Sequence, residues 1–173
     1  MDSANIEQLP RETLLELVKT YARNWQTLDG LWFGNVEAEF GLDTAVKLDL
    51  MNWEKMAALE AERLKKVLKL NQGGLDSILK VLSLMSWQMV SPRFQIEKES
   101  PTRIVFSYPR CTVQEGRKKA GKQEFPCNTM KMTLLSNLAR VVEPKARVKC
   151  LACPPDTHPP EFWCKWELTM AEE

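Results

Sequence analysis

A chain of 173 residues, 44% of them hydrophobic and 27% charged, is long enough to bury a core and is not typical of a disordered segment. Its formal net charge of +1 provides no global attraction for nucleic acid or an anionic membrane surface, so we expect neither as a partner. The polar first ten residues lack the pattern of a signal peptide, and no apolar stretch reaches the length of a membrane span. We therefore predict a cytoplasmic protein.

The first 90 residues are predicted to form a helical part. Apolar residues recur every three or four positions after Pro10, which predicts a first helix that continues toward Phe40 unless Asp29 and Gly30 interrupt it. Gly41 is well suited to end this helix, because glycine accepts the left-handed backbone conformation that closes many helices.

Two further helices complete the helical part. Asp43 has the side chain of an N-cap, so we expect a second helix over residues 44–70, with basic residues in the last turns where the helix dipole favours them. A third helix is predicted over 75–89. Its apolar residues lie on most sides, which indicates a buried helix.

The period of the apolar residues changes from 3.6 to about 2 after Pro92. Alternation over 94–97 and again over 104–108 predicts an antiparallel hairpin that turns at 99–102. We interpret 111–122 as a polar, basic connection.

The remaining residues contain one helix and two strands. They are, in order, a helix over 128–142, a strand over 146–150, a proline-rich loop over 154–160 and a strand over 162–168. The sequence thus predicts an α+β fold, with N-terminal helices followed by an antiparallel sheet that has one inserted helix. We divide the chain into a helical part, 1–90, and a sheet part, 91–173, which we expect to form one cooperative domain.

Four of the five cysteines have the spacing of a metal site. Cys150 and Cys153 form a C-x2-C pair, Cys127 precedes the pair, and Cys164 follows it. Four thiolates in a tetrahedron suit Zn²⁺, although iron accepts the same ligands. Alternation in the predicted strands turns Cys150 and Cys164 inward. The alternative interpretation is that Cys127 and Cys164 are small buried hydrophobic side chains.

The fifth cysteine and the single histidine receive no firm role. Cys111 is a spare thiol, a nucleophile or an ordinary edge-strand residue, and His158 lies in a proline-rich loop. The segment 116–122 has the spacing of a phosphate-binding loop, but Gln123 stands where the Mg²⁺-binding Ser or Thr is needed. We interpret that segment as a solvated basic loop.

An acidic residue lies among large aromatic residues in the helical part. Trp25, Asp29, Trp32 and Phe33 share one face of the first helix, and Trp53 belongs to the second. These residues would form a pocket for a small apolar or aromatic ligand, with Asp29 holding one polar group of it. The same pattern is typical of an ordinary core in which the acid accepts a tryptophan N–H.

Several segments carry a family resemblance. They are Cys111-Thr-Val-Gln-Glu-Gly-Arg, Phe125-Pro-Cys127, Val148-Lys-Cys150-Leu-Ala-Cys153 and Phe162-Trp-Cys164-Lys-Trp-Glu-Leu. Together they resemble the C-terminal half of the vinyl-reductase-type small-ligand-binding domain, a family that includes sensor domains of phenol-responsive transcription activators and relatives of transport-particle subunits. The whole chain also resembles an uncharacterised bacterial and archaeal family that is related to the L-2-amino-thiazoline-4-carboxylate hydrolases.

This resemblance implies a zinc site beside an aromatic pocket. The sensor relatives bind zinc through three cysteines, which fall on Cys127, Cys153 and Cys164, and a glutamate, which falls on Cys150. Because that position is a cysteine here, the resemblance implies a four-thiolate site.

Three expectations for the function follow. The first is a small-molecule-binding domain with a structural zinc that ties the helix over 128–142 to the last two strands. The second is a hydrolase of small cyclic amides or thiazolines that uses a more open metal site or Cys111. The third is a structural module that forms a homodimer.

Overall fold

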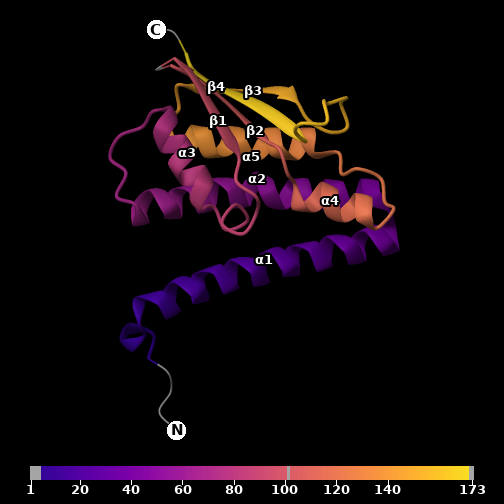
Figure 1. The fold of residues 1–173 in the computed structure, drawn as a ribbon, viewed down its shortest axis with the longest axis horizontal. Coiled ribbons are helices and arrows are strands. Elements are labelled where there is room, and N and C mark those ends of the chain that lie inside the picture. The colour runs from indigo at the N-terminus through magenta and orange to yellow at the C-terminus, as the bar shows by residue number, and fades with distance from the viewer. Residues whose placement is uncertain (1–4, 101, 172–173) are drawn as a thin grey trace.

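The computed structural model of this chain describes residues 5–100 and 102–171. They form an α+β fold in which the helices come first and an antiparallel sheet follows, as the sequence predicts (Figure 1). The strands are β1 (Gln95–Ser100), β2 (Arg103–Tyr108), β3 (Ala146–Ala152) and β4 (Cys164–Met170). They lie in the order β1-β2-β4-β3, so the last strand of the chain is central.

Two long helices begin the fold after a short 3-10 helix, η1 (Ile6–Gln8). α1 (Arg11–Phe40) is continuous, so the possible interruption at Asp29 and Gly30 does not occur. Gly41 alone joins α1 to α2 (Leu42–Val67), has a φ of 83° and donates its N–H to the carbonyl of Glu37, which confirms the predicted helix end. Asp43 was wrongly predicted as an N-cap, because α2 starts directly after the glycine and Asp43 lies in its first turn.

The third helix and the hairpin follow the prediction with shifted ends. α3 (Leu75–Leu84) stops before the predicted residue 89, since the backbone turns to an extended conformation at Met85. β1 and β2 pair as expected, with Ile96 opposite Phe106. Pro101, in the predicted turn, lies outside the described residues.

The segment 111–122 is not simply a connection, and that prediction was wrong. It contains α4 (Thr112–Lys119), a helix whose inner face is polar, because its buried side chains are Gln114 and Arg117. The next helix, α5 (Cys127–Val142), begins one residue before the predicted helix over 128–142.

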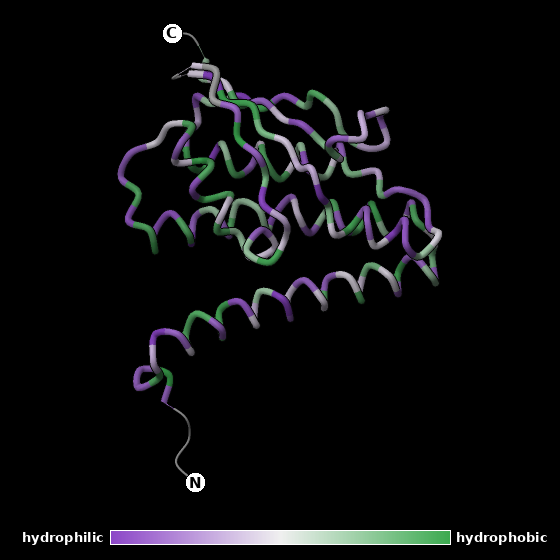
Figure 2. Tube along the Cα trace, viewed as in Figure 1, coloured by the Kyte–Doolittle hydropathy of each residue, from purple (hydrophilic) through white to green (hydrophobic). Residues whose placement is uncertain are grey.

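A single apolar core joins the two predicted parts of the chain. It lies between one face of the sheet and the helices α2, α3 and α5, and its fully buried side chains include Ile78, Phe106, Leu135 and Trp166. Figure 1 shows α5 between the sheet and α2, and Figure 2 shows hydrophobic residues recurring along these helices. The helical part, 1–90, therefore shares its core with the sheet part, 91–173.

α1 lies outside this core. It packs against α2, and Figure 1 shows its N-terminal end diverging from the other elements. Ala22 is the one residue of α1 that is fully buried, whereas several of its large apolar residues are exposed: Leu15, Val18, Tyr21, Leu28, Leu31 and Phe40. None of the helices in the described part of the chain combines the length and hydropathy needed to cross a membrane.

Candidate functional site

A cavity of about 420 Å³ lies where α1 meets α2, α4 and α5. Four of the five residues that the sequence singles out for a pocket line it: Trp25, Asp29, Phe33 and Trp53. Trp32 is not among the lining residues and is 39% exposed. Its position on the helix places it at the edge of the face that Trp25, Asp29 and Phe33 share, so it is directed past the cavity.

Aromatic pairs connect α1 to the other walls of the cavity. The rings of Trp25 and Trp53 meet edge to face with centroids 5.5 Å apart, and those of Phe33 and Phe125 do the same at 5.4 Å. The first pair joins α1 to α2, and the second joins α1 to the loop before α5. Such pairs add modest stabilisation beyond their buried area.

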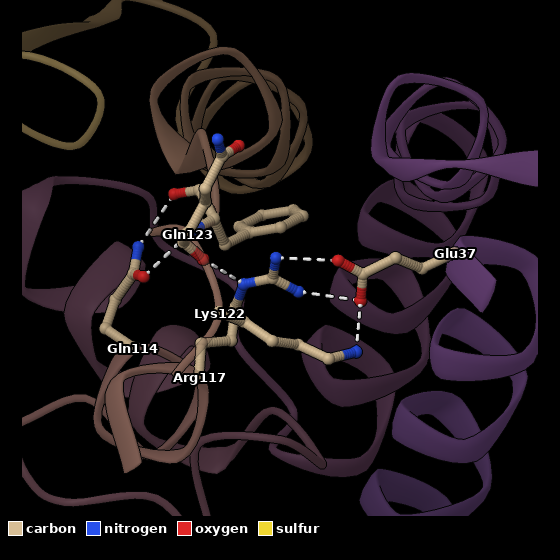
Figure 3. Close-up of polar contacts among 6 residues, drawn as sticks. Glu37, Gln114, Arg117, Lys122 and Gln123 are labelled. Atoms are coloured by element: carbon tan, nitrogen blue, oxygen red, sulfur yellow. Dashed lines mark hydrogen bonds and ion pairs between the residues drawn. The ribbon is translucent and has the colours of Figure 1, made fainter. Parts of the chain in front are cut away.

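An ion pair fixes the C-terminal end of α1. The guanidinium of Arg117 donates to both carboxylate oxygens of Glu37, at 3.0 and 2.8 Å, and Lys122 donates to the same carboxylate at 2.8 Å (Figure 3). These hydrogen bonds lower the pKa of Glu37 to about 2, against an opposing effect of burial. The Glu37 side chain is only 14% exposed, so this is a partly buried contact and not a solvated surface pair.

The segment 116–122, which has the spacing of a phosphate-binding loop, does not form such a loop. Its residues Arg117 and Lys122 make the contacts with Glu37 described above. Gly116 lies within α4, and Arg117 also donates to the backbone carbonyl of Gln123 at 2.6 Å. The side chain of Gln114 bonds both the N–H and the carbonyl of Phe125 (Figure 3), which holds the following loop against α4. Two basic residues of this segment, Arg117 and Lys122, therefore hold α1, and Arg117 also holds the loop that follows α4.

Two carboxyl groups lie in the wall of the cavity, Asp29 half-buried and Asp49 buried. Burial raises the pKa of Asp29, and burial together with the charge of Asp29 raises the pKa of Asp49 to about 7. The indole N–H of Trp53 acts in the opposite direction on Asp49 through a hydrogen bond. Asp49 is 5% exposed and lines the cavity, so its carboxyl is a second polar group available to a ligand.

A buried ammonium group lies in another part of the wall. Lys131 of α5 is 5% exposed, and its Nζ lies 3.6 Å from the ring centroid of Trp87 and 4.6 Å from that of Tyr108. It also donates to the hydroxyl of Tyr108 at 3.3 Å. Burial lowers the pKa of Lys131, while the four nearby cysteines, Cys164, Cys127, Cys111 and Cys153, raise it.

Sequence reasoning missed Asp49 and Lys131, although a signal for both was present. Asp49 precedes Trp53 by one helical turn, and Lys131 precedes Leu135 by the same spacing, so each lies on the apolar face of its helix. A charged residue at such a position indicates either a buried partner or a polar group in a cavity.

The structure brings three of the four predicted metal-binding cysteines together. Cys127 begins α5, Cys164 begins β4, and the thiol of Cys153, which follows β3, is hydrogen-bonded to both. These hydrogen bonds, together with burial, raise the pKa of Cys153, whereas the hydrogen bond from Cys153 lowers the pKa of Cys164 against an opposing effect of burial. Cys150 points to the same face of the sheet, as its strand alternation predicts, but it is only half-buried.

The cysteine cluster has features that suit a metal and one that does not. The buried indole N–H of Trp166 makes no hydrogen bond in the described part of the chain, yet it lies close enough to Cys164 to lower the pKa of that thiol. A buried donor without an acceptor needs an explanation, and a thiolate at Cys164 would supply an acceptor for this N–H. Within residues 5–100 and 102–171, however, no group of three or more His, Cys, Asp or Glu side chains is arranged to hold a metal ion.

Cys111 and His158 differ in their relation to the cavity. Cys111 lines it, and burial raises the pKa of its thiol to about 11, which opposes the thiolate that a nucleophile needs at neutral pH. The Nδ1–H of His158 donates to the carbonyl of Pro159, 3.0 Å away, and the imidazole lies beside the ring of Trp163. It is not among the residues that line the cavity.

The chain belongs to a family of unknown function, DUF6125, whose model matches residues 7–170. No curated protein matches the sequence. The resemblance to the vinyl-reductase-type domain therefore stays a prediction.

One similar solved structure is subunit 3 of a trafficking protein particle complex from Naegleria fowleri, covalently bound to palmitic acid. It is 13% identical, and the alignment covers 90% of this chain and 95% of that one with a TM-score of 0.46. At this TM-score the similarity supports no argument about fold or ligand.

Proposed function

We propose that this member of the DUF6125 family is a cytoplasmic small-molecule-binding domain whose ligand, a small apolar or aromatic compound, occupies the cavity beneath α1. The observation that carries the proposal is the cavity itself, because aromatic rings and a few buried polar groups converge on about 420 Å³ of space. This combination is what small-ligand sites share. All five cysteines are free thiols, as expected for a protein in a reducing compartment.

A substitution that fills the cavity tests this function. Gly34 of α1 lines the cavity, and a Cβ at this position would meet no atom within 4 Å. We expect Gly34→Leu to block ligand binding while leaving the melting temperature unchanged or higher, because leucine also favours a helix. Binding is measured with a panel of small aromatic compounds through tryptophan fluorescence, since Trp25, Trp53 and Trp87 line the cavity.

The matched control is Ala38→Leu. Ala38 is exposed on the same helix and is not a lining residue, so the added side chain does not enter the cavity. A Gly34→Leu protein that binds the same compounds as the wild type would show that the cavity is not the ligand site.

The cysteine cluster supports a second element of this proposal, a structural zinc bound by Cys127, Cys150, Cys153 and Cys164. The convergence of three thiols, from α5, from the residue after β3 and from β4, supports it, and Zn²⁺ would replace their mutual hydrogen bonds with metal–sulfur bonds. A bound ion would link those elements and add its binding energy to folding.

Metal analysis tests the zinc separately from the ligand. We expect one zinc per purified chain, a lower melting temperature with a chelator, and loss of the metal in Cys153→Ala but not in Cys111→Ala. A metal-free wild type whose melting is unaffected by chelators would exclude the zinc and leave the cavity proposal intact.

The exposed apolar face of α1 favours a further role, as the contact surface of a homodimer. Leu28 is 68% exposed and Leu31 is 60% exposed, so an ordinary surface helix does not account for them. A second copy that packs its own α1 there would bury these residues. Molar mass against concentration tests this, with Leu28→Glu expected to shift the mass toward the monomer.

A further inference from the structure

We propose that the ligand of this cavity is a carboxylic acid, and that its carboxylate binds at the ammonium of Lys131 while its apolar or aromatic body lies beneath α1. This inference rests on the proposed function and names the ligand class for the same cavity. Its support comes from the burial of Lys131, from the groups that surround its ammonium, and from the lack of an internal counter-ion.

Burial of an ammonium group costs several kcal/mol unless an opposite charge or several acceptors compensate for it. Lys131 is 5% exposed and faces the cavity. The groups that contact its Nζ are the rings of Trp87 and Tyr108 and the hydroxyl of Tyr108, and all of them are neutral. In the described part of the chain no carboxylate forms an ion pair with it.

The ammonium has donors left for a ligand. It has three N–H groups, and one donates to the hydroxyl of Tyr108. That hydroxyl in turn donates to the side-chain oxygen of Gln88 at 3.0 Å, so its direction is fixed. Trp87 and Tyr108 stabilise the positive charge through their ring faces, which do not neutralise it. A ligand anion would complete this environment.

A single ammonium in a mainly apolar wall matches a ligand with a single negative charge. A carboxylate requires one cation and a few donors, whereas a phosphate group usually meets several basic groups or a row of backbone N–H groups. Arg117, the other buried basic residue of the wall, is already paired with Glu37. The cavity volume of about 420 Å³ accommodates a carboxylic acid with one aromatic ring.

Two other arrangements compete with this one. In the first, Lys131 is the counter-ion of a thiolate in the cysteine cluster and contacts no ligand. In the second, the two acids of the wall, Asp29 and Asp49, are the main anchor, and the ligand carries an amine.

A series of matched ligands separates these arrangements. The probes are 3-phenylpropanoate, 3-phenylpropanamide and 3-phenylpropylamine, measured by calorimetry on the full chain at neutral pH. We expect the acid to bind about tenfold or more tightly than the amide, and the amine to bind weakest. In Lys131→Met the advantage of the acid over the amide should disappear. The control, Lys80→Met, removes an exposed lysine of α3 that does not line the cavity and should keep the advantage.

Each other result overturns the inference. Equal binding of acid and amide, or preference for the amine, would leave the cavity as a binding site but remove Lys131 as its anchor. Failure of all three probes, including the neutral amide, to bind the wild type would count against the proposed function itself.

The melting temperature independently tests whether a ligand is the partner of the Lys131 ammonium group. If a ligand is its partner, Lys131→Met in the ligand-free protein should melt at the same temperature or higher, because it removes an uncompensated buried charge. A lower melting temperature together with slower reaction of the thiols with a thiol reagent would assign Lys131 to the cysteine cluster instead.

Discussion

The body of this molecule, from α2 to β4, and the helix α1 are held in place by different forces. The body encloses a continuous apolar core that includes side chains with no exposed surface. α1 buries only Ala22, and its other contacts include two aromatic pairs, a hydrogen bond from Gln26 to Ser91, and the ion pairs of Glu37 with Arg117 and Lys122. The core therefore specifies the fold of the body. α1 forms one wall of the cavity, and the position of this helix depends on a few separate contacts.

The largest difference between the two regions should appear when apolar side chains are truncated. Leu135→Ala removes a fully buried side chain of the core and should lower the free energy of unfolding by about 2–5 kcal/mol. Phe33→Ala, on the half-buried face of α1, should lower it by about 1–2 kcal/mol. Urea denaturation measures both, and equal losses would show that α1 belongs to the core.

A buried acid at the contact between the regions makes stability depend on pH. The pKa of Asp49 is raised to about 7 in the folded protein. The protonated carboxyl therefore contributes its full stabilisation of the folded state below about pH 4, and this stabilisation is lost as the pH rises through about 7. Asp49→Asn should remove this loss. At pH 8 it should be more stable than the wild type by at most about 4 kcal/mol, and at pH 4 the difference should be small.

Glu54→Gln is the matched control for the Asp49 variant, because Glu54 is exposed on the same helix. Its melting temperature should follow that of the wild type at every pH. A wild type whose melting temperature is the same at pH 5 and pH 8 would contradict a buried Asp49 carboxyl.

Loss of the ion pair between Glu37 and Arg117 should destabilise the position of α1 more than it destabilises the body. Glu37→Gln removes the charge opposite Arg117, and it should weaken the docking of α1 by about 1–3 kcal/mol. Because the pKa of Glu37 is lowered to about 2, the wild-type contact should persist at pH 5 and be lost progressively as the pH falls from about 4 toward 2.

Hydrogen exchange distinguishes this local effect from global unfolding. Amides of α1 should exchange faster in Glu37→Gln, while those of α5 and β4 keep the rate of the wild type. Glu39 is exposed and lies two residues after Glu37 in α1, so Glu39→Gln should leave the exchange rates of both regions unchanged. Faster exchange throughout the chain would mean that α1 and the body unfold together.

The smallest effect is expected at Trp32, which the sequence placed in the pocket and the structure places outside it. Trp32→Gln should change the free energy of unfolding by less than about 0.5 kcal/mol in the monomer, and ligand binding should be retained. Loss of binding, measured by calorimetry, would extend the ligand site to the outer edge of α1.

The parts of the fold that were predictable are those with an apolar period. The helices around Trp53 and Leu135 and the strands around Phe106 and Trp166 have such a period, and they were found with small errors at their ends. α4 was missed because its buried face consists of Gln114 and Arg117, whose partners are a backbone segment and Glu37 of a distant helix.

The same reason limits prediction of the site. The face of Trp25, Asp29 and Phe33 was found because helical spacing is a local property. The position of Lys131 beside Trp87 and Tyr108 depends on how α5, the turn after α3 and β2 meet, which no local pattern contains. The convergence of Cys127, Cys153 and Cys164 was anticipated from spacing and resemblance, whereas their mutual hydrogen bonds were not.

The connection through Gly41 has a mechanical consequence. With one residue between two long helices, α1 is a rigid lever of 30 residues, about 45 Å, that pivots at its C-terminal end. A rotation of about 10° would move Asp29 by about 3 Å and Arg11 by about 8 Å. The contact between Glu37 and Arg117 lies one helical turn from Gly41, so it resists a rotation of α1 less than a contact farther along the helix would. The length of α1 therefore converts a small opening of the cavity into a larger displacement near Arg11, and a distance label at that end would measure it.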